Sequence, residues 1–218
     1  MLICGIDEAG KGPVVGSLFI AGVVFEEGIV ASLQTDGVKD SKLLTHKKRE
    51  HLCGIIKKKA IRWKVIQIKP SEIDEAVDGN TYLNLNWLEA LKTADLINEL
   101  KPDMAIVDCP SPNVEKYTNF LKRFLRNKSI KLVVEHKADV KYFPCSAASI
   151  LAKCAREDEV KEIEKRIGES IGTGYMSNPI CVEFLKNNWE RHSDLFRHSR
   201  QPFKEHRDGK KQKSLGEF

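Results

Sequence analysis

Continuous apolar runs open the chain and predict two strands. Residues 2–6 are uniformly apolar and lead into Asp7 and Glu8, a pattern typical of a buried strand that emerges into solvent. After a turn rich in glycine and proline, residues 14–25 are rich in β-branched and aromatic side chains. They predict a second strand that is broken at Gly16.

Farther along the chain, the spacing of apolar residues becomes that of helices. Residues 45–60 place apolar side chains on one face, and Thr45 is a suitable N-cap. Residues 61–68 alternate well enough to predict a third strand, and further helices are predicted over residues 71–77 and 83–100.

From residue 104 onward, strands and helices alternate. A strand over residues 104–107 ends in another acid, Asp108, and a strand over residues 131–134 leads into a loop that carries Asp139. Helices are predicted over residues 114–125, 147–167 and 180–188, and a polar, basic tail follows from Arg197.

An antiparallel opening followed by this alternation implies an α/β fold, a mixed sheet with helices packed on its faces. The helices after Gly172 have no strand partners in the pattern. We therefore expect one domain over residues 1–170 and a small C-terminal helical region with its basic tail over residues 171–218.

Composition narrows the classes of protein without selecting one. The chain has 218 residues and a formal net charge of +5, which permits a local nucleic-acid-binding patch but is common among soluble proteins. Its six cysteines form no C-x-x-C pair, which argues against a zinc ribbon. Since no apolar run approaches the ~20 residues that cross a bilayer and Met1 opens no signal peptide, we expect a cytoplasmic protein that does not enter membranes.

Four acids follow predicted strands: Asp7, Glu8, Asp108 and Asp139. In open α/β sheets, side chains just past strand ends project into a common crevice. Carboxylates gathered there repel one another unless a cation neutralises them, and an all-oxygen set suits Mg²⁺ or Mn²⁺. Two such ions, about 3.5–4 Å apart, can catalyse phosphodiester hydrolysis. Taken singly, each acid is more simply a solvated loop residue, so the prediction rests on their grouping.

Six segments of the chain resemble ribonuclease HII, and they follow one another in that family's order. They are residues 5–13 (GIDEAGKGP), 40–44 (DSKLL), 107–110 (VDCP), 136–139 (HKAD), 146–153 (SAASILAK) and 172–175 (GTGY). One short segment would be weak, but six in order are specific, and they span most of the chain. The compact length and the C-terminal region look more like the archaeal members of the family than the bacterial ones.

The resemblance implies a ribonuclease H-type fold, a five-stranded mixed sheet flanked by helices with a C-terminal helical region. It implies an endoribonuclease that cuts the RNA strand of RNA–DNA hybrids and cuts DNA 5′ to single embedded ribonucleotides, leaving a 3′-hydroxyl and a 5′-phosphate. Asp7, Glu8, Asp108 and Asp139 would be the catalytic carboxylates and would hold two Mg²⁺ or Mn²⁺ ions.

The resemblance also suggests how the substrate is bound. The family's Gly-Arg-Gly segment, which senses the ribose 2′-hydroxyl, is Gly10-Lys11-Gly12 here. Lysine lacks the planar fork of arginine, so we expect weaker affinity but retained function through backbone groups. Tyr175 matches a tyrosine that stacks on the sugar following the ribonucleotide.

Basic side chains are the remaining candidates for substrate contact. We expect Lys42 and Lys153 to contact phosphates, although a solvated surface lysine is nearly as good an interpretation of each. The basic tail from Arg197 either adds nonspecific backbone contacts or is a solvated end of the chain.

Two other functions stay open on the sequence. A nuclease of the same fold that acts on DNA junctions would share the acids but would not need Gly10-Lys11-Gly12 or Tyr175. A catalytically silent hybrid-binding module would be favoured if one of the four acids were missing. For the ribonuclease interpretation we expect a monomer whose partner is nucleic acid, in DNA replication and repair.

Overall fold

The computed structural model describes residues 1–215 except residues 39–40, 42–43 and 80–82, and it describes side chains as far as residue 209. Its contacts divide the chain into two compact units. Unit 1 comprises Met1–Ala9, Phe19–Gln67 and Leu85–Arg156, and unit 2 comprises Gly10–Leu18, Ile68–Asn84 and Glu157–Phe218. The units are interleaved along the sequence, and the expected domain boundary at residue 170 stays a prediction.

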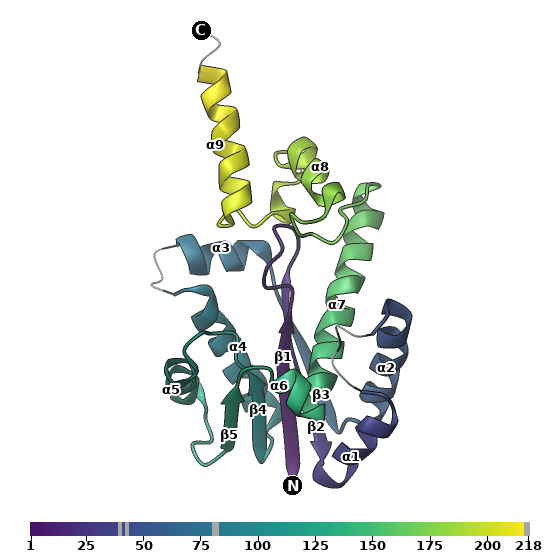
Figure 1. Ribbon diagram of the computed structural model, residues 1–218. Helices are drawn as coiled ribbons and strands as arrows, with labels where there is room; N and C mark the ends of the chain where they lie inside the picture. The colour runs from purple at the N-terminus through teal and green to yellow at the C-terminus, as the bar shows by residue number, and fades with distance from the viewer. Residues whose placement is uncertain (39–40, 42–43, 80–82, 216–218) are drawn as a thin grey trace. The chain divides into compact units, whose positions relative to one another are not determined.

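A mixed five-stranded sheet forms the centre of unit 1 (Figure 1). Its strands are β1 (Leu2–Ala9), β2 (Leu18–Glu26), β3 (Arg62–Ile68), β4 (Met104–Asp108) and β5 (Lys131–Glu135), in the order β3-β2-β1-β4-β5. β2 runs antiparallel to β1, whereas β4 runs parallel to β1 and β5 parallel to β4. The expected fold class, an α/β mixed sheet flanked by helices, is confirmed.

Strand β1 occupies the middle of the sheet because its residues are apolar on both faces. Cys4 and Ile6 are buried on one face, and Ile3 is buried on the other. A β-carbon at Gly5 would overlap the backbone of Pro144 and Cys145. Glycine is therefore what allows the first turn of a helix to pack directly on this strand.

Helices cover both faces of the sheet. They are α1 (Glu27–Thr35), α2 (His46–Lys59), α4 (Leu85–Leu100), α5 (Val114–Phe124), the short α6 (Ala138–Lys141) and the first half of α7 (Phe143–Ile167). Figure 1 shows α1, α2 and α7 on one side of the sheet and α4 and α5 on the other. On the first side, Ala148 and Leu151 of α7 share a core with Val23 of β2 and Leu52 of α2.

Unit 2 has a core of its own. Its helices are α3 (Pro70–Asp78), the second half of α7, α8 (Pro179–Asn188), the 3-10 helix η2 (Ser193–Leu195) and α9 (Gln201–Leu215). Val14 and Val15 pack with Phe184, Phe196 and Phe203, and Val15 pairs with Phe196 as an isolated antiparallel bridge. The segment that follows β1 thus belongs to a different core from β1 itself.

Most of the predicted elements are present within a few residues of their expected bounds. Thr45 caps α2 as expected, since its hydroxyl accepts a hydrogen bond from the Lys48 amide at 3.4 Å. Helix α1 was not predicted, and α7 begins at Phe143 rather than at residue 147. No helix among the described residues is long and apolar enough to span a membrane.

Three predictions were wrong. Residues 14–17 do not form a strand, because Val14 bonds instead to the carbonyl of Gly174 at 2.9 Å. Asp139 lies in helix α6 rather than in a loop. Residues 201–215 form helix α9, and Arg197 is completely buried instead of belonging to a solvated tail.

Candidate active site

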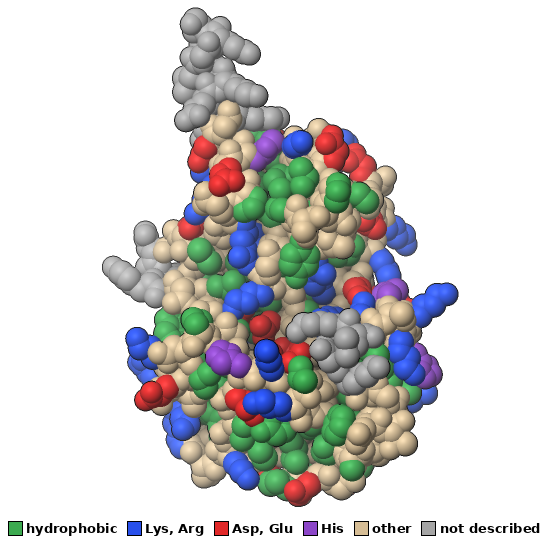
Figure 2. Space-filling view, in the orientation of Figure 1, with side chains coloured by type: hydrophobic (Ala, Val, Ile, Leu, Met, Phe, Trp, Pro, Cys, Tyr) green, Lys and Arg blue, Asp and Glu red, His purple; other side chains and the backbone are tan. Residues whose placement is uncertain are grey.

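Three aspartates meet at one end of the sheet in unit 1. Asp7, Asp108 and Asp139 each offer a carboxylate oxygen, and these three oxygens all lie within 4.8 Å of one another. Parallel pairing explains the first two, because the β1–β4 register joins Ile6 to Val107 and the next residue of each strand is the aspartate. Near α6, Figure 2 shows acidic side chains with Lys and Arg side chains among them.

Asp108 also fixes the third member of this trio. Its Oδ1 accepts a hydrogen bond from the backbone amide of Ala138 at 2.9 Å. Ala138 is the first residue of α6, and Asp139 follows it within the first turn of that helix. The carboxylate that ends β4 therefore holds the start of the helix that carries Asp139.

Two members of the trio are buried, Asp108 is half-buried, and the three carboxylates repel one another. Asp7 is 5% exposed and Asp139 is 3% exposed. Burial, with a smaller contribution from the charges of Asp108 and Asp139, raises the pKa of Asp7 from 3.8 to about 7. Hydrogen bonds from Ser149 and from the Glu8 amide, the latter at 2.7 Å, oppose this shift without cancelling it. A positive charge among the three carboxylates would relieve the repulsion.

The donor set fits a divalent cation that prefers oxygen. All three side chains of the trio are carboxylates, and hard cations such as Mg²⁺ and Mn²⁺ take such ligands. The mutual repulsion of these carboxylates, two of which are buried, is the observation that supports this fit.

Glu8 is not a member of the trio. It follows Asp7 in β1, and successive side chains of a strand point to opposite faces. The charge of Glu8 instead acts on Tyr117 of α5. Burial, together with the charges of Glu89 and Glu8, raises the pKa of Tyr117 well above its usual value. The role of Glu8 as a metal ligand stays a prediction.

A line of hydrogen bonds leads from Asp7 to a lysine. The hydroxyl of Ser149 bonds to the Asp7 carboxylate, and Ser41 Oγ lies 2.8 Å from Ser149 Oγ. Lys153, one helical turn after Ser149 in α7, donates to the Ser41 hydroxyl. The predicted phosphate contact of Lys153 is untested, and Lys42 lies outside the described residues. Both serines occur in segments that carry the family resemblance, but their link to Asp7 was not predicted.

The predicted recognition residues lie together in unit 2. Gly10 has a φ of 88°, a conformation that favours glycine. A β-carbon at Gly12 would lie 3.0 Å from Cε1 of Tyr175, whose side chain is 37% exposed. The structure thus places Tyr175 against the Gly10-Lys11-Gly12 segment, while the binding role of these residues stays a prediction.

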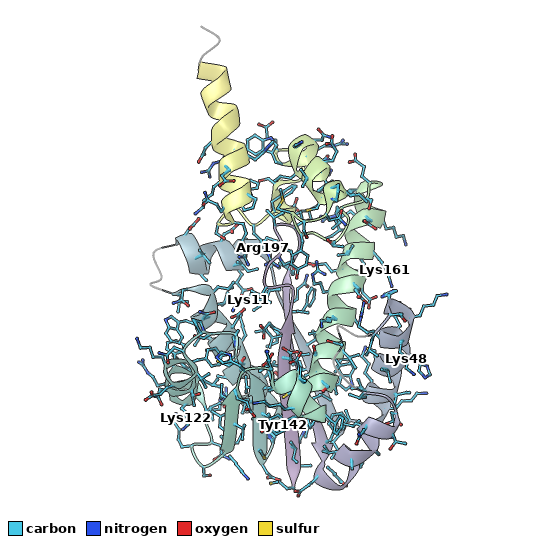
Figure 3. The ribbon with its side chains drawn as sticks, viewed as in Figure 1. Lys11, Lys48, Lys122, Tyr142, Lys161 and Arg197 are labelled. Carbon is cyan, nitrogen blue, oxygen red and sulfur yellow. The ribbon has the colours of Figure 1, made fainter. Side chains whose placement is uncertain are left out.

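Arg197 is a contributor to this region that the sequence did not reveal. Its guanidinium donates to the carbonyls of Gly10 and Lys11, and Figure 3 shows the labelled Arg197 and Lys11 near each other. In the sequence it is only the first basic residue of a basic, polar stretch, so no local signal distinguishes it from a solvated arginine.

Comparisons with known proteins identify the family. The family model described as Ribonuclease HII matches residues 4–205. A ribonuclease HII of Methanosarcina barkeri is 40% identical over 202 residues, covering 90% of this chain and 89% of the relative. The crystal structure of ribonuclease H2 from Pyrococcus horikoshii OT3 superposes with a TM-score of 0.85 at 33% identity, covering 95% of this chain and 98% of that one.

Two further structures agree with this result. The ribonuclease HII in a PCNA complex from Archaeoglobus fulgidus gives a TM-score of 0.79 at 36% identity, covering 90% of this chain and 94% of that one. A ribonuclease HIII in complex with Mn²⁺ shares the fold with a TM-score of 0.79 at 18% identity, over 94% of this chain and 69% of that one. The family match, the identity near 40% and the shared fold together show that the chain belongs to the ribonuclease HII family of endoribonucleases.

Proposed function

We propose that this ribonuclease H cuts the RNA strand of RNA–DNA hybrids and also cuts duplex DNA 5′ to single ribonucleotides. The products would carry a 3′-hydroxyl and a 5′-phosphate. The observation that carries the proposal is the trio of Asp7, Asp108 and Asp139, whose oxygens lie within 4.8 Å of one another. Such a trio suits phosphodiester hydrolysis that depends on divalent cations.

The carboxylates would hold two Mg²⁺ or Mn²⁺ ions, with Glu8 as a fourth ligand beside the trio. When bound, the cations would promote attack by water on the phosphorus and stabilise the leaving 3′-oxygen. The protein's own part is to keep the carboxylates in place. Ser149 bonds to Asp7, and the Ala138 amide bonds to Asp108 at 2.9 Å, so neither carboxylate needs to reorganise on binding.

Selection of a ribonucleotide is assigned to the segment Gly10-Lys11-Gly12. Its backbone would contact the 2′-hydroxyl, which distinguishes RNA from DNA at a given nucleotide. Tyr175 would stack on the sugar that follows, and Lys42 and Lys153 would contact phosphates. Only Ala9 separates Glu8 from Gly10 in the chain, so the segment begins directly after the proposed metal ligands.

Cleavage specificity separates this proposal from its two alternatives. Two labelled duplexes, one all DNA and one with a single embedded ribonucleotide, are incubated with the protein in Mg²⁺ or Mn²⁺ and in a chelator. We expect metal-dependent cutting only 5′ to the ribonucleotide. Cutting of both duplexes would favour a nuclease of DNA junctions, and no cutting with either metal would leave the hybrid-binding module.

A matched variant tests the role of the trio in the same assay. Asp7→Asn keeps the shape of the side chain but removes its charge, so we expect it to abolish cleavage while hybrid binding stays largely intact. Retained cleavage would reject Asp7 as a metal ligand.

A protein partner is also proposed. The Archaeoglobus fulgidus relative was solved in a complex with PCNA, and this chain is 36% identical to it. We propose that the present protein is a cytoplasmic monomer that binds PCNA during replication or repair. Gel filtration of the protein alone and mixed with PCNA tests both statements, since a dimer peak or the absence of co-elution would contradict one of them.

A further inference from the structure

Arg197 places its whole guanidinium against the backbone of the segment that follows β1. The side chain is 0% exposed. Its Nε donates to the Gly16 carbonyl at 2.8 Å, its Nη1 to the Lys11 carbonyl at 3.0 Å and its Nη2 to the Gly10 carbonyl at 2.6 Å. A single side chain thus bonds to three carbonyls of one short loop.

Local packing holds Arg197 at this place. Its backbone amide donates to the Val14 carbonyl at 2.9 Å, and the neighbouring Phe196 is buried in the core of unit 2 and pairs with Val15. A buried cation needs strong hydrogen-bond acceptors, and three carbonyl dipoles supply them. The planar fork of arginine suits this arrangement, whereas the point charge of lysine could not reproduce it.

The direction of these bonds fixes where the amides of the loop point. A trans peptide is planar, and its C=O and N–H groups point in opposite directions. No cis peptide occurs among the described residues. Because the carbonyls of Gly10 and Lys11 point toward Arg197, the amides of Lys11 and Gly12, which belong to the same two peptide groups, point away from it.

The same contacts strengthen these amides as donors. Arg200 also donates to the Lys11 carbonyl, so two guanidinium groups polarise the Lys11–Gly12 peptide. Hydrogen bonds in a chain polarise one another, and a cation at the carbonyl end increases the partial positive charge of the N–H. Successive amides turned to one side form a donor site for hydroxyl or phosphate oxygens.

The rest of the loop is fixed independently. The Gly174 carbonyl accepts from Val14, the Leu195 carbonyl accepts from Gly16 at 2.9 Å, and Glu159 accepts from the amide of Ser17 at 2.8 Å. Two of the three carbonyls held by Arg197, those of Gly10 and Lys11, lie at the recognition end of the loop, next to Tyr175.

We propose that Arg197 is a positioning residue for the selection of ribonucleotides. It turns the amides of Lys11 and Gly12 toward the substrate and polarises them, so that the loop recognises the 2′-hydroxyl although its own central side chain is lysine. The inference rests on the proposed function, because it concerns how the same loop distinguishes RNA from DNA.

The experiment compares selectivity among arginine variants. For each protein, kcat and KM are measured on a duplex with one ribonucleotide, and the inhibition constant of an all-DNA duplex is measured as a competitor. Arg197→Met removes all three bonds, Arg197→Lys keeps the charge without the fork, and Arg200→Met removes only one contact to Lys11. Arg166→Met is the matched control, because Arg166 is an exposed arginine of unit 2 paired with Asp194 at 3.4 Å.

We expect selectivity, the ratio of the DNA inhibition constant to KM, to fall by about tenfold or more in Arg197→Met. In Arg197→Lys and Arg200→Met the selectivity should fall by about twofold to fivefold, with kcat less affected than KM. The selectivity of Arg166→Met should match that of the wild type. Stabilisation of each variant by Mg²⁺ in a thermal melt should be unchanged, which separates loss of selectivity from damage to the aspartate trio.

The outcomes separate the two proposals. If the wild type cuts without regard to the ribonucleotide, the proposed function fails. If the wild type is selective and the Arg197 and Arg200 variants are equally selective, the inference about Arg197 is overturned. Should Arg197→Met not fold, Arg197→Lys and Arg200→Met decide the matter, and unchanged selectivity in both would reject the inference.

Discussion

The ring of Tyr175 lies directly against the backbone of Gly12. A β-carbon at Gly12 would stand 3.0 Å from Cε1 of the ring and 3.6 Å from Cδ1. The loop of Gly12 and the turn of Tyr175 are joined by backbone as well, since the Gly174 carbonyl accepts from Val14. Two residues predicted to contact neighbouring nucleotides of the substrate are thus packed directly on each other.

This packing predicts the effect of Gly12→Ala. The added methyl group is closer to the ring than ordinary contact allows, so Tyr175 must shift, and we expect KM for a single-ribonucleotide duplex to rise several-fold. In a Tyr175→Ala background the same change should have little further effect, because its target is absent. Gly28→Ala is the control, since nothing lies within 4 Å of a β-carbon there. Additive effects of Gly12→Ala and Tyr175→Ala would contradict the coupling.

The aspartate trio predicts that Asp7→Asn stabilises the protein when metal is absent. Removing the buried charge of Asp7, which the other two carboxylates repel, should raise the free energy of unfolding at pH 8 by about 1 kcal/mol or more. The variant should also lose most of its stabilisation by Mg²⁺. Thermal melts with a chelator and with Mg²⁺ measure both effects, and Asp158→Asn, at an exposed ion pair with Lys161, serves as the control. A destabilised metal-free variant would argue against repulsion in the trio.

The raised pKa of Asp7 predicts a pH dependence of the metal-free protein. Its pKa is about 7 in the folded state against an ordinary 3.8, so the folded state binds the proton more tightly between these values. The resulting stabilisation is fully present below pH 3.8 and is lost as the pH rises to about 7. Urea unfolding in a chelator should therefore show that the advantage of Asp7→Asn over the wild type grows from pH 4.5 to pH 8. If the difference in stability between Asp7→Asn and the wild type did not change with pH, the raised pKa of Asp7 would be ruled out.

Two glycines predict opposite effects of alanine on stability. At Gly5 the new methyl group would overlap the backbone of Pro144, which no side-chain rotation can relieve, so we expect a loss of about 3 kcal/mol or more. At Gly54, within α2, nothing lies within 4 Å of the added carbon, and alanine should stabilise by about 0.5–1 kcal/mol. Denaturant unfolding of both variants checks the pair, and a mild effect at Gly5 would contradict the close packing of α7 on β1.

Local patterns were enough to predict the fold class and part of the site. The apolar runs that lead into Asp7 and Asp108 form strands with acids near their carboxyl ends, as predicted. The prediction was possible because an apolar run and the acid that follows it can both be recognised from neighbouring residues. The helical periods from Thr45 onward and the capping role of Thr45 are local in the same sense. The type of ligand, oxygen alone, also follows from residue identity.

The tertiary structure decided which distant residues meet. Ser41 and Ser149 are 108 positions apart, yet their hydroxyls form a hydrogen bond that leads to Asp7. Arg197 reaches carbonyls that precede it by 181 to 187 positions. In the sequence, Ser41, Ser149 and Arg197 look the same as serines and arginines that are exposed to solvent. Their roles arise from long-range packing, which brings these side chains to partners far away in the sequence. Such packing leaves no local pattern by which the residues could be recognised.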